Sequence, residues 1–338
     1  MDAAPVATAA LSGLSAAGIL ALVPLFALLR ARSAGESLRA RRMFFVATLG
    51  AVMTGIAVLT GITGIAPAYI APAIALGALF ATVATLGIAG APLGRQLIYA
   101  LVLTAAVFVP IVSVVLTLWW DPFATGLGYL DFGVALPIVI AAACATLGTL
   151  VVARVVDRAR PQPVRLGTGS LGLVAAIWLA WLAWLLGLQL GIDPVAGLIV
   201  INTVVMPIAA VATAALVERL RRRRNTISGV VFGALGGLAA AAPTAAYLIT
   251  PVALVVGLLA GMLVAFLPEG GAARRIAATL LVAGGSGILL LGLVAKDVSF
   301  IYTGQPEVLF GQVLAVILAG IAGFGVAALL WLALRPRR

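Results

Sequence analysis

The sequence predicts an all-α polytopic membrane protein with eleven transmembrane helices, and three observations support this fold class. Hydrophobic residues make up 64% and charged residues 9% of the 338 residues, which leaves too little polar surface to cover a soluble globule. The apolar residues gather in runs of about 20, the length a helix needs to cross about 30 Å of hydrocarbon. The basic residues fall in alternate gaps between these runs. A water-soluble enzyme is therefore excluded.

Each apolar run is interpreted as one membrane span, and the eighth run is the shortest. In chain order, the runs lie near 8–29, 43–62, 69–90, 96–119, 132–153, 169–190, 194–217, 227–242, 250–267, 276–295 and 309–334. The gaps between them are too short for an extramembrane domain. Residues 1–338 are therefore expected to form a single transmembrane domain.

The basic residues predict which side of the membrane each gap faces. Of the 21 Lys and Arg residues, all but Lys296 lie in alternate gaps, and such residues favour the cytoplasmic side. The cytoplasmic segments are Arg30 to Arg42, Arg95, Arg154 to Arg165, Arg219 to Arg224, Arg274 with Arg275, and Arg335 to Arg338. This pattern predicts an integral protein of the cell (plasma or inner) membrane, with its N-terminus outside and its C-terminus in the cytoplasm.

The net charge of +11 does not indicate nucleic-acid binding, because the basic residues are dispersed over short segments without interleaved aromatic residues. Cys144 is the only cysteine, and the chain contains no histidine. No metal site and no cofactor are therefore expected.

Eleven spans divide into five, five and one, and an odd number per repeat inverts the second repeat relative to the first. Many transporter folds use such inverted repeats, with a substrate path between the halves. The count is compatible with a first repeat at about 8–153, a second at about 169–295 and a last helix at about 309–334.

Several stretches then resemble one family in the same order along the chain. Leu130 to Gly133 is similar to the L-D-F-A-G-G stretch that opens the fifth helix of the ammonium transporter (Amt/Mep/Rh) family. Ile201 to Thr203, followed by an Ala-rich helix and Glu218, resembles the family's V-N-T and E-W stretches, and 233–247 resembles its G-A-V-A-G-L-V-A-I-T-P-A-A-G-Y. This resemblance implies the family's eleven-span fold, a homotrimer and a path for ammonium or ammonia in each protomer.

The chain departs from the family where the resemblance places two histidines that line the conducting lumen. These positions match Val139, eight residues after Asp131, and Ala283 in the tenth span. Valine and alanine provide no hydrogen bond to a passing solute. No remaining side chain titrates near neutrality without a shift, so the proton relay of two histidines is absent. Electrogenic ammonium transport is therefore expected to be weak or absent.

Other positions of the candidate path follow from the same resemblance. Trp119 matches the tryptophan of the family's outer cation-recruitment site, although a tryptophan at a helix end also fits the interfacial aromatic belt. The family's W-F-G-F-N-A-G-S stretch matches Trp181 to Leu188, so Trp184 replaces the inner gate phenylalanine and Leu188 the vestibule serine. Phe80 matches the other gate phenylalanine. Aromatic faces at Trp119 and Trp184 would attract a cation.

Asp131 and the polar residues within the spans each allow two interpretations, a role in the solute path or a structural role. Asp131 either attracts a cation or caps the N-terminus of the fifth helix, and capping is the preferred interpretation. Asn202 and Ser286, with Thr146 and Thr203, could line the path. Residues of this kind more often bond to the backbone or to a neighbouring helix.

The sequence thus predicts a small-solute membrane channel or transporter embedded in the lipid bilayer, with ammonium or ammonia as the solute by family resemblance. The alternatives are a non-conducting structural or sensing protein on the same fold and a transporter of another small solute. An intramembrane enzyme ranks last, because no nucleophile or metal site can be assembled. The tail after Arg335 is short, so the family's cytoplasmic regulatory partner is not expected.

Overall fold

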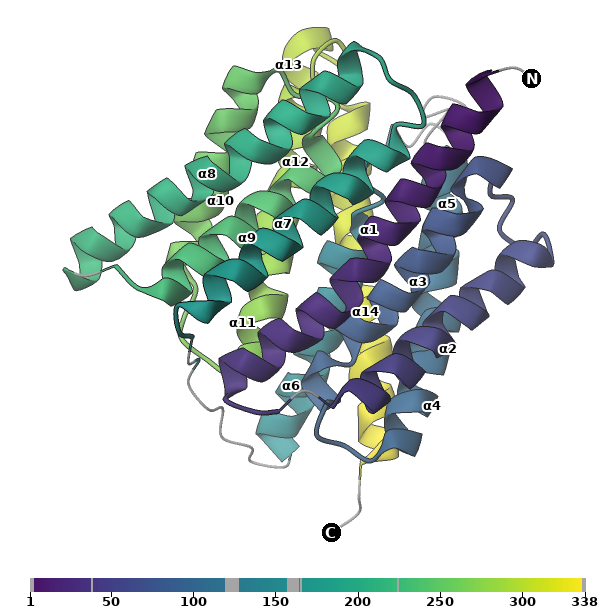
Figure 1. The fold of residues 1–338 in the computed structure, drawn as a ribbon, viewed down its shortest axis with the longest axis vertical. Helices are drawn as coiled ribbons and strands as arrows, with labels where there is room; N and C mark the ends of the chain where they lie inside the picture. Colours follow the sequence, from purple (N-terminus) through teal and green to yellow (C-terminus); the bar gives the residue numbers. More distant parts are fainter. Residues whose placement is uncertain are drawn as a thin grey trace.

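The structure, a computed structural model, describes residues 3–37, 39–118, 128–156, 164, 166–223 and 225–335. Throughout these ranges the regular structure is helical, without a β-strand. The prediction of an all-α protein is confirmed. In the view of Figure 1, the start of α1 and the end of α14 lie at opposite ends of the molecule, as an odd number of crossings requires.

The chain order of the elements follows the predicted runs. The α-helices are α1 (Ala3–Ala34), α2 (Ala40–Leu59), α3 (Ile70–Ala84), α4 (Leu93–Leu103), α5 (Val109–Leu118), α6 (Ala143–Val156), α7 (Gly169–Leu188), α8 (Pro194–Arg222), α9 (Ile227–Thr244), α10 (Thr250–Phe266), α11 (Ala272–Thr279), α12 (Gly285–Val294), α13 (Phe300–Thr303) and α14 (Glu307–Leu334). Two 3₁₀ turns, η1 (Pro67–Tyr69) and η2 (Leu86–Ile88), flank α3.

In the described part of the chain, three spans contain a π-helical turn. The fourth span is α4, η3 (Thr104–Phe108) and α5, the fifth is η4 (Leu136–Ala142) and α6, and the tenth is α11, η5 (Leu280–Gly284) and α12. Such turns widen a helix locally and are frequent at functional sites. Two of them occur in the spans that carry Val139 and Ala283.

Ten helical segments of the described chain are long and apolar enough to cross a membrane, and α10 is an eleventh, shorter apolar helix of 17 residues. The eighth span was expected to be the shortest, and this is wrong. Pro243 lies inside α9 instead of ending it, so α9 reaches 18 residues. The ninth span is shorter because Pro251 occupies its first turn and Pro268 follows its end, positions where proline limits a helix.

Side-chain and proline caps define the start of two helices in the second half. Asp193 accepts a hydrogen bond of 3.0 Å from the N–H of Ala196, and Pro194 fills the first position of α8. That N–H bond holds the pKa of Asp193 below its usual range. Thr226 caps α9 by accepting from the N–H of Gly229 at 2.9 Å.

Long-range packing joins the first half of the chain to the second. Helix α1 packs along α7, and α6 packs along α14. Glycines allow the close approach: a Cβ on Gly18 would lie 2.6 Å from the backbone of α7, and a Cβ on Gly148 would lie 2.6 Å from the carbonyl oxygen of Phe324. Close backbone contact of this kind drives helix association in lipid, where the hydrophobic effect gives no help.

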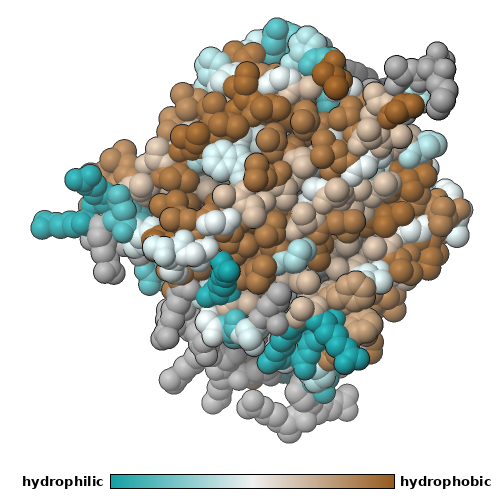
Figure 2. Space-filling view, viewed as in Figure 1, coloured by the Kyte–Doolittle hydropathy of each residue, from teal (hydrophilic) through white to brown (hydrophobic). Residues whose placement is uncertain are grey.

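The outer surface has the apolar band that a bilayer requires. Large exposed hydrophobic side chains include Leu59, Ile192, Leu220, Ile321 and Leu329, each at least 65% exposed. Figure 2 shows hydrophobic residues over the middle of the visible face, with hydrophilic residues gathered toward its ends. Together with the spans, this surface identifies the chain as an integral membrane protein.

Candidate functional site

Val139 and Ala283 lie on π-helical turns that meet inside the molecule. Val139 belongs to η4 and Ala283 to η5, and both side chains are fully buried. A Cβ added to Gly284 would lie 2.5 Å from the Cβ of Val139, so Val139 rests on the backbone of the residue after Ala283. The structure thus brings together two elements that are far apart in the sequence.

A third helix, α9, closes the same region. A Cβ added to Gly236 would lie 3.5 Å from the Cβ of Ala283, and a Cβ on Gly287 would lie 2.8 Å from the carbonyl oxygen of Ala240. The buried face of α9 in this stretch consists of glycine, alanine and leucine. The junction of η4, η5 and α9 is therefore apolar and tightly packed.

The matched gate residues belong to two separate aromatic pairs. Phe80 of α3 packs against Phe108 of η3, with ring centroids 5.1 Å apart and an interplanar angle of 40°. Trp184 packs against Trp181 at 5.0 Å, and Phe26 of α1 lies 6.3 Å from Trp181. The ring partner of Phe80 is thus Phe108, which the sequence comparison did not single out.

Trp181 and Trp184 are both fully buried, and their indole Nε1 atoms have no hydrogen-bond partner among the described residues. Leu188, one turn further along α7, is 1% exposed. Buried indole N–H groups usually find an acceptor, and each unpaired group has a free-energy cost of about 1–3 kcal/mol. Both unpaired N–H groups belong to the aromatic pair that contains the matched gate residue Trp184.

Asp131 acts as a helix cap. Its Oδ1 accepts from the N–H of Ala135 at 2.8 Å, and its Oδ2 accepts from the N–H of Leu136 at 2.8 Å and from the Tyr129 hydroxyl at 3.0 Å. The side chain is fully buried. The carboxylate neutralises the positive N-terminal end of the fifth span and fixes where η4 begins, so its geometry fits the capping interpretation.

Asn202 joins two helices. Its Nδ2 donates to the carbonyl oxygens of Ala245 and Leu248, at 2.9 and 2.7 Å, just beyond the last residue of α9. Those carbonyls have no partner within the helix, so the amide of Asn202 satisfies them. Its Oδ1 atom is buried and has no partner in the described chain.

Two of the other polar candidates, Ser286 and Thr146, bond to the backbone as well. Ser286 donates to the carbonyl oxygen of Ala283 at 2.8 Å, and Thr146 donates from α6 to that of Val83 in α3 at 2.6 Å. The Thr203 hydroxyl is buried without a partner in the described chain, while its carbonyl accepts from Trp178 Nε1 at 2.9 Å. Trp119 lies outside the described residues.

A second carboxylate that serves as a structural anchor is Glu218. Glu218, at the end of α8, accepts from the backbone N–H of Thr226 at 3.0 Å and from its hydroxyl at 2.9 Å. Only glycine fits at position 229, because a Cβ on this residue would overlap the Glu218 carboxylate. The sequence contains both residues but gives no indication that they meet.

The geometry limits what this region can do chemically. The Val139 and Ala283 side chains have no hydrogen-bonding atoms. The Asp131 carboxylate already accepts hydrogen bonds from within the protein. An uncharged solute crossing the junction would lose hydrogen bonds to water at about 1–3 kcal/mol per unpaired group. For an ion, the free-energy cost of crossing the junction would be several kcal/mol or more, on the order of the cost of placing a charge at the bilayer centre.

Comparison with known proteins adds a family assignment. The model of the Ammonium Transporter Family matches residues 43–336. An ammonium transporter of Bacillus subtilis (strain 168) is 29% identical over 169 residues, which amount to 50% of this chain and 41% of that protein. The match thus spans less than half the length of that relative.

Solved structures are similar over nearly the whole chain. The crystal structure of Candida albicans Mep2 has a TM-score of 0.79 at 16% identity and covers 98% of this chain and 84% of its own. That of Saccharomyces cerevisiae Mep2 has a TM-score of 0.80 at 15% identity, with coverages of 96% and 87%. A structure described as a Sensor Amt Protein has a TM-score of 0.75 at 18% identity, with coverages of 97% and 91%. At these identities the likeness shows the fold.

Proposed function

Because this chain belongs to the ammonium transporter family, a family of transporters and not of enzymes, we propose that it is a small-solute channel whose path passes neutral ammonia and excludes the ammonium ion. The observation that carries this proposal is the junction of η4 and η5, where Val139 rests on Gly284 beside Ala283. This apolar junction penalises a charge far more than a neutral molecule of the same size.

Flux measurements on proteoliposomes test the proposal. An ammonium gradient should make the interior alkaline faster than in protein-free liposomes, as read by an enclosed pH dye in a stopped-flow instrument. A solid-supported-membrane recording should show no current, because only the neutral species crosses. A current would contradict the exclusion of the ion.

Histidine substitutions test where the path lies. The double variant Val139→His and Ala283→His should raise ammonium flux and produce a current, because two imidazoles at the junction can accept and pass a proton. Val204→His, at a 37% exposed position on α8, is the control and should leave flux unchanged. Both variants must elute as folded protein in size-exclusion chromatography. An unchanged flux in the folded double variant would count against this path.

A second candidate is a non-conducting sensing protein on the same fold. Trp181 and Trp184 are fully buried against each other at the matched inner gate, which favours a closed path. A solved structure with this fold is described as a Sensor Amt Protein. This candidate predicts fluxes of ammonium and methylammonium equal to those of empty liposomes, with binding still detectable by calorimetry.

We further propose two inverted five-helix repeats and a last helix. The π-helical turns η4 and η5 support this proposal, because they fall in the fifth and the tenth span, which are equivalent positions in such repeats. A homotrimer is proposed from family membership alone. Native mass spectrometry of the detergent-solubilised protein should give three times the 34.2 kDa of one chain, and a monomer would contradict it.

A further inference from the structure

A small basic pocket lies apart from the candidate path, at one end of the first four helices. It is formed where α1 ends, α2 begins, α3 ends and α4 begins, and its volume is about 60 Å³. Its lining residues are Ala27, Arg30, Ala31, Ser37, Arg39, Arg42, Met43, Val46, Thr82, Thr85, Leu86, Ala89 and Gln96. One water needs about 10–15 Å³, so the pocket has room for about four to six water-sized atoms, enough for a phosphate group.

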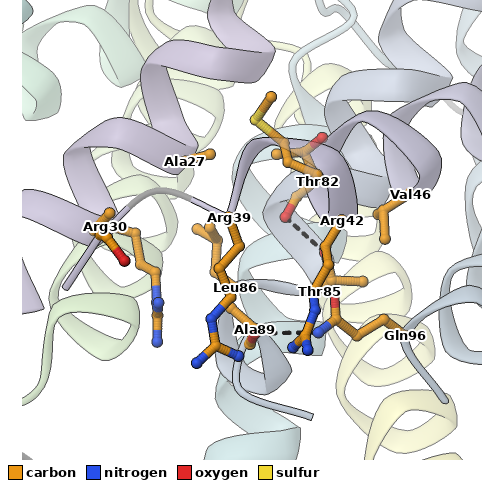
Figure 3. Close-up of a pocket in the computed structure, with 13 residues that line it drawn as sticks. Ala27, Arg30, Arg39, Arg42, Val46, Thr82, Thr85, Leu86, Ala89 and Gln96 are labelled. Atoms are coloured by element: carbon orange, nitrogen blue, oxygen red, sulfur yellow. Dashed lines mark hydrogen bonds between the residues drawn. The ribbon is translucent and has the colours of Figure 1, made fainter. Parts of the chain in front are cut away.

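The pocket carries an excess of positive charge. Figure 3 shows Arg30, Arg39 and Arg42 among the lining side chains, with their guanidinium groups toward the lower part of the view. Arg30 pairs with Glu36 at 2.6 Å, and within the described residues no carboxylate pairs with the other two arginines. Segment 30–42 contains five arginines and one glutamate, a net charge of +4.

The donors of these arginines are only partly used. Within the described residues Arg42 donates one hydrogen bond, to the carbonyl oxygen of Ala91 at 3.1 Å, and this bond fixes its orientation. Among the described residues, neither the buried Nε of Arg30 nor the Arg39 guanidinium has a hydrogen-bond partner. Helix α2 also begins without a side-chain cap. Guanidinium groups recognise phosphate through two parallel hydrogen bonds, so this set of donors suits a phosphate.

We propose that this pocket binds a phosphate group, with Arg39 and Arg42 as its main ligands and Arg30 at its wall. Membrane lipid is the favoured source. The pocket lies at the end of the spans, and basic pockets between helices on the cytoplasmic side bind anionic headgroups. Part of its lining is apolar, including Ala27 and Met43, and the neighbouring Phe44 on α2 is 63% exposed, so acyl chains could lie along that helix.

Lipid retention tests the proposal with the purified full chain. Native mass spectrometry should show retention of dioctanoyl phosphatidic acid well above dioctanoyl phosphatidylcholine. Arg39→Gln should weaken that retention about fivefold, the effect of about one charge near a membrane surface. Arg41→Gln is the matched control, because Arg41 lies over the Phe45 ring at 5.8 Å and does not line the pocket, and it should change retention less than twofold.

Two further measurements complete the test. Ala27→Leu fills the pocket without changing charge, and it should weaken retention by a similar factor even if Arg39→Gln fails to fold. Calorimetry with inorganic phosphate distinguishes the sources: binding that depends on Arg39 and not on Arg41 would support a soluble phosphate as ligand. No preference for phosphatidic acid and no phosphate binding, or an equal effect of both arginine variants, would overturn the proposal.

Discussion

Asp131 shows how one buried charge is accommodated in a chain with few charged residues. Its two oxygens accept three hydrogen bonds, two from backbone N–H groups at the start of η4 and one from Tyr129. A carboxylate is suited to this position because it offers acceptors on both oxygens and also favours the positive end of the helix. Its structural task leaves little capacity to hold a solute cation.

Asp131→Asn should therefore destabilise the protein by about 1–3 kcal/mol, because an amide oxygen replaces one acceptor and an NH₂ group opposes a donor at the other. The midpoint of thermal unfolding in detergent measures this effect. Asp193→Asn is the control at an exposed cap and should lower the midpoint less. Equal shifts of the midpoint in the two variants would show that burial of the Asp131 hydrogen bonds adds nothing to stability.

Val139 of η4 lies directly against Gly284 of η5, so a side chain added at position 284 has no free space. Gly284→Ala should destabilise the protein by about 1–3 kcal/mol, because the new Cβ would lie 2.5 Å from both the Cβ and the Cγ2 of Val139, and alanine at position 139 lacks that Cγ2. Adding Val139→Ala should recover part of the loss, whereas Val139→Ala alone should be destabilising. The double-mutant cycle is measured by thermal unfolding in detergent, and simple additivity would contradict the contact.

At the scale of elements, both ends of α9 depend on polar contacts with α8. Glu218 of α8 fixes the first turn of α9 through Thr226, and Asn202 of α8 satisfies the carbonyls after the end of α9. Helix α9 is thus held at both ends by α8. Prolines limit α10 instead, which explains why the shorter helix is the ninth span.

Glu218→Gln should loosen the start of α9, because the amide cannot accept from the Thr226 N–H and hydroxyl at both oxygens. We expect a loss of about 1–2 kcal/mol, the range of a helix cap. Faster hydrogen exchange confined to the first turn of α9 would show the mechanism. Glu307→Gln, in the exposed first turn of α14, is the matched control and should leave α9 unchanged.

At the scale of the whole molecule, the distribution of charge predicts how the bundle sits in the bilayer. The excess of arginine at one set of helix ends is expected to face the cytoplasm. The buried Cys144 makes single-cysteine labelling practical, because it is 8% exposed and is the only cysteine of the chain.

In right-side-out vesicles, a membrane-impermeant maleimide should label Gln305→Cys, which follows α13, and should label Glu269→Cys only after the membrane is permeabilised. Both positions are exposed, so accessibility within the protein does not decide the result. The unmodified chain, whose Cys144 is buried, should remain unlabelled. The opposite pattern would invert the proposed orientation.

The sequence by itself determined the class of the protein, the existence and order of its spans, and the family resemblance. These properties depend on hydrophobic length and on residues close together in the chain, such as Leu130 to Gly133. Only the tertiary structure decided that Val139 meets Gly284, that Phe80 pairs with Phe108 and that Glu218 meets Thr226. The basic pocket likewise requires four helix ends to converge. Such contacts depend on how helices cross, and the apolar composition of a span does not specify which of its faces meets which neighbour.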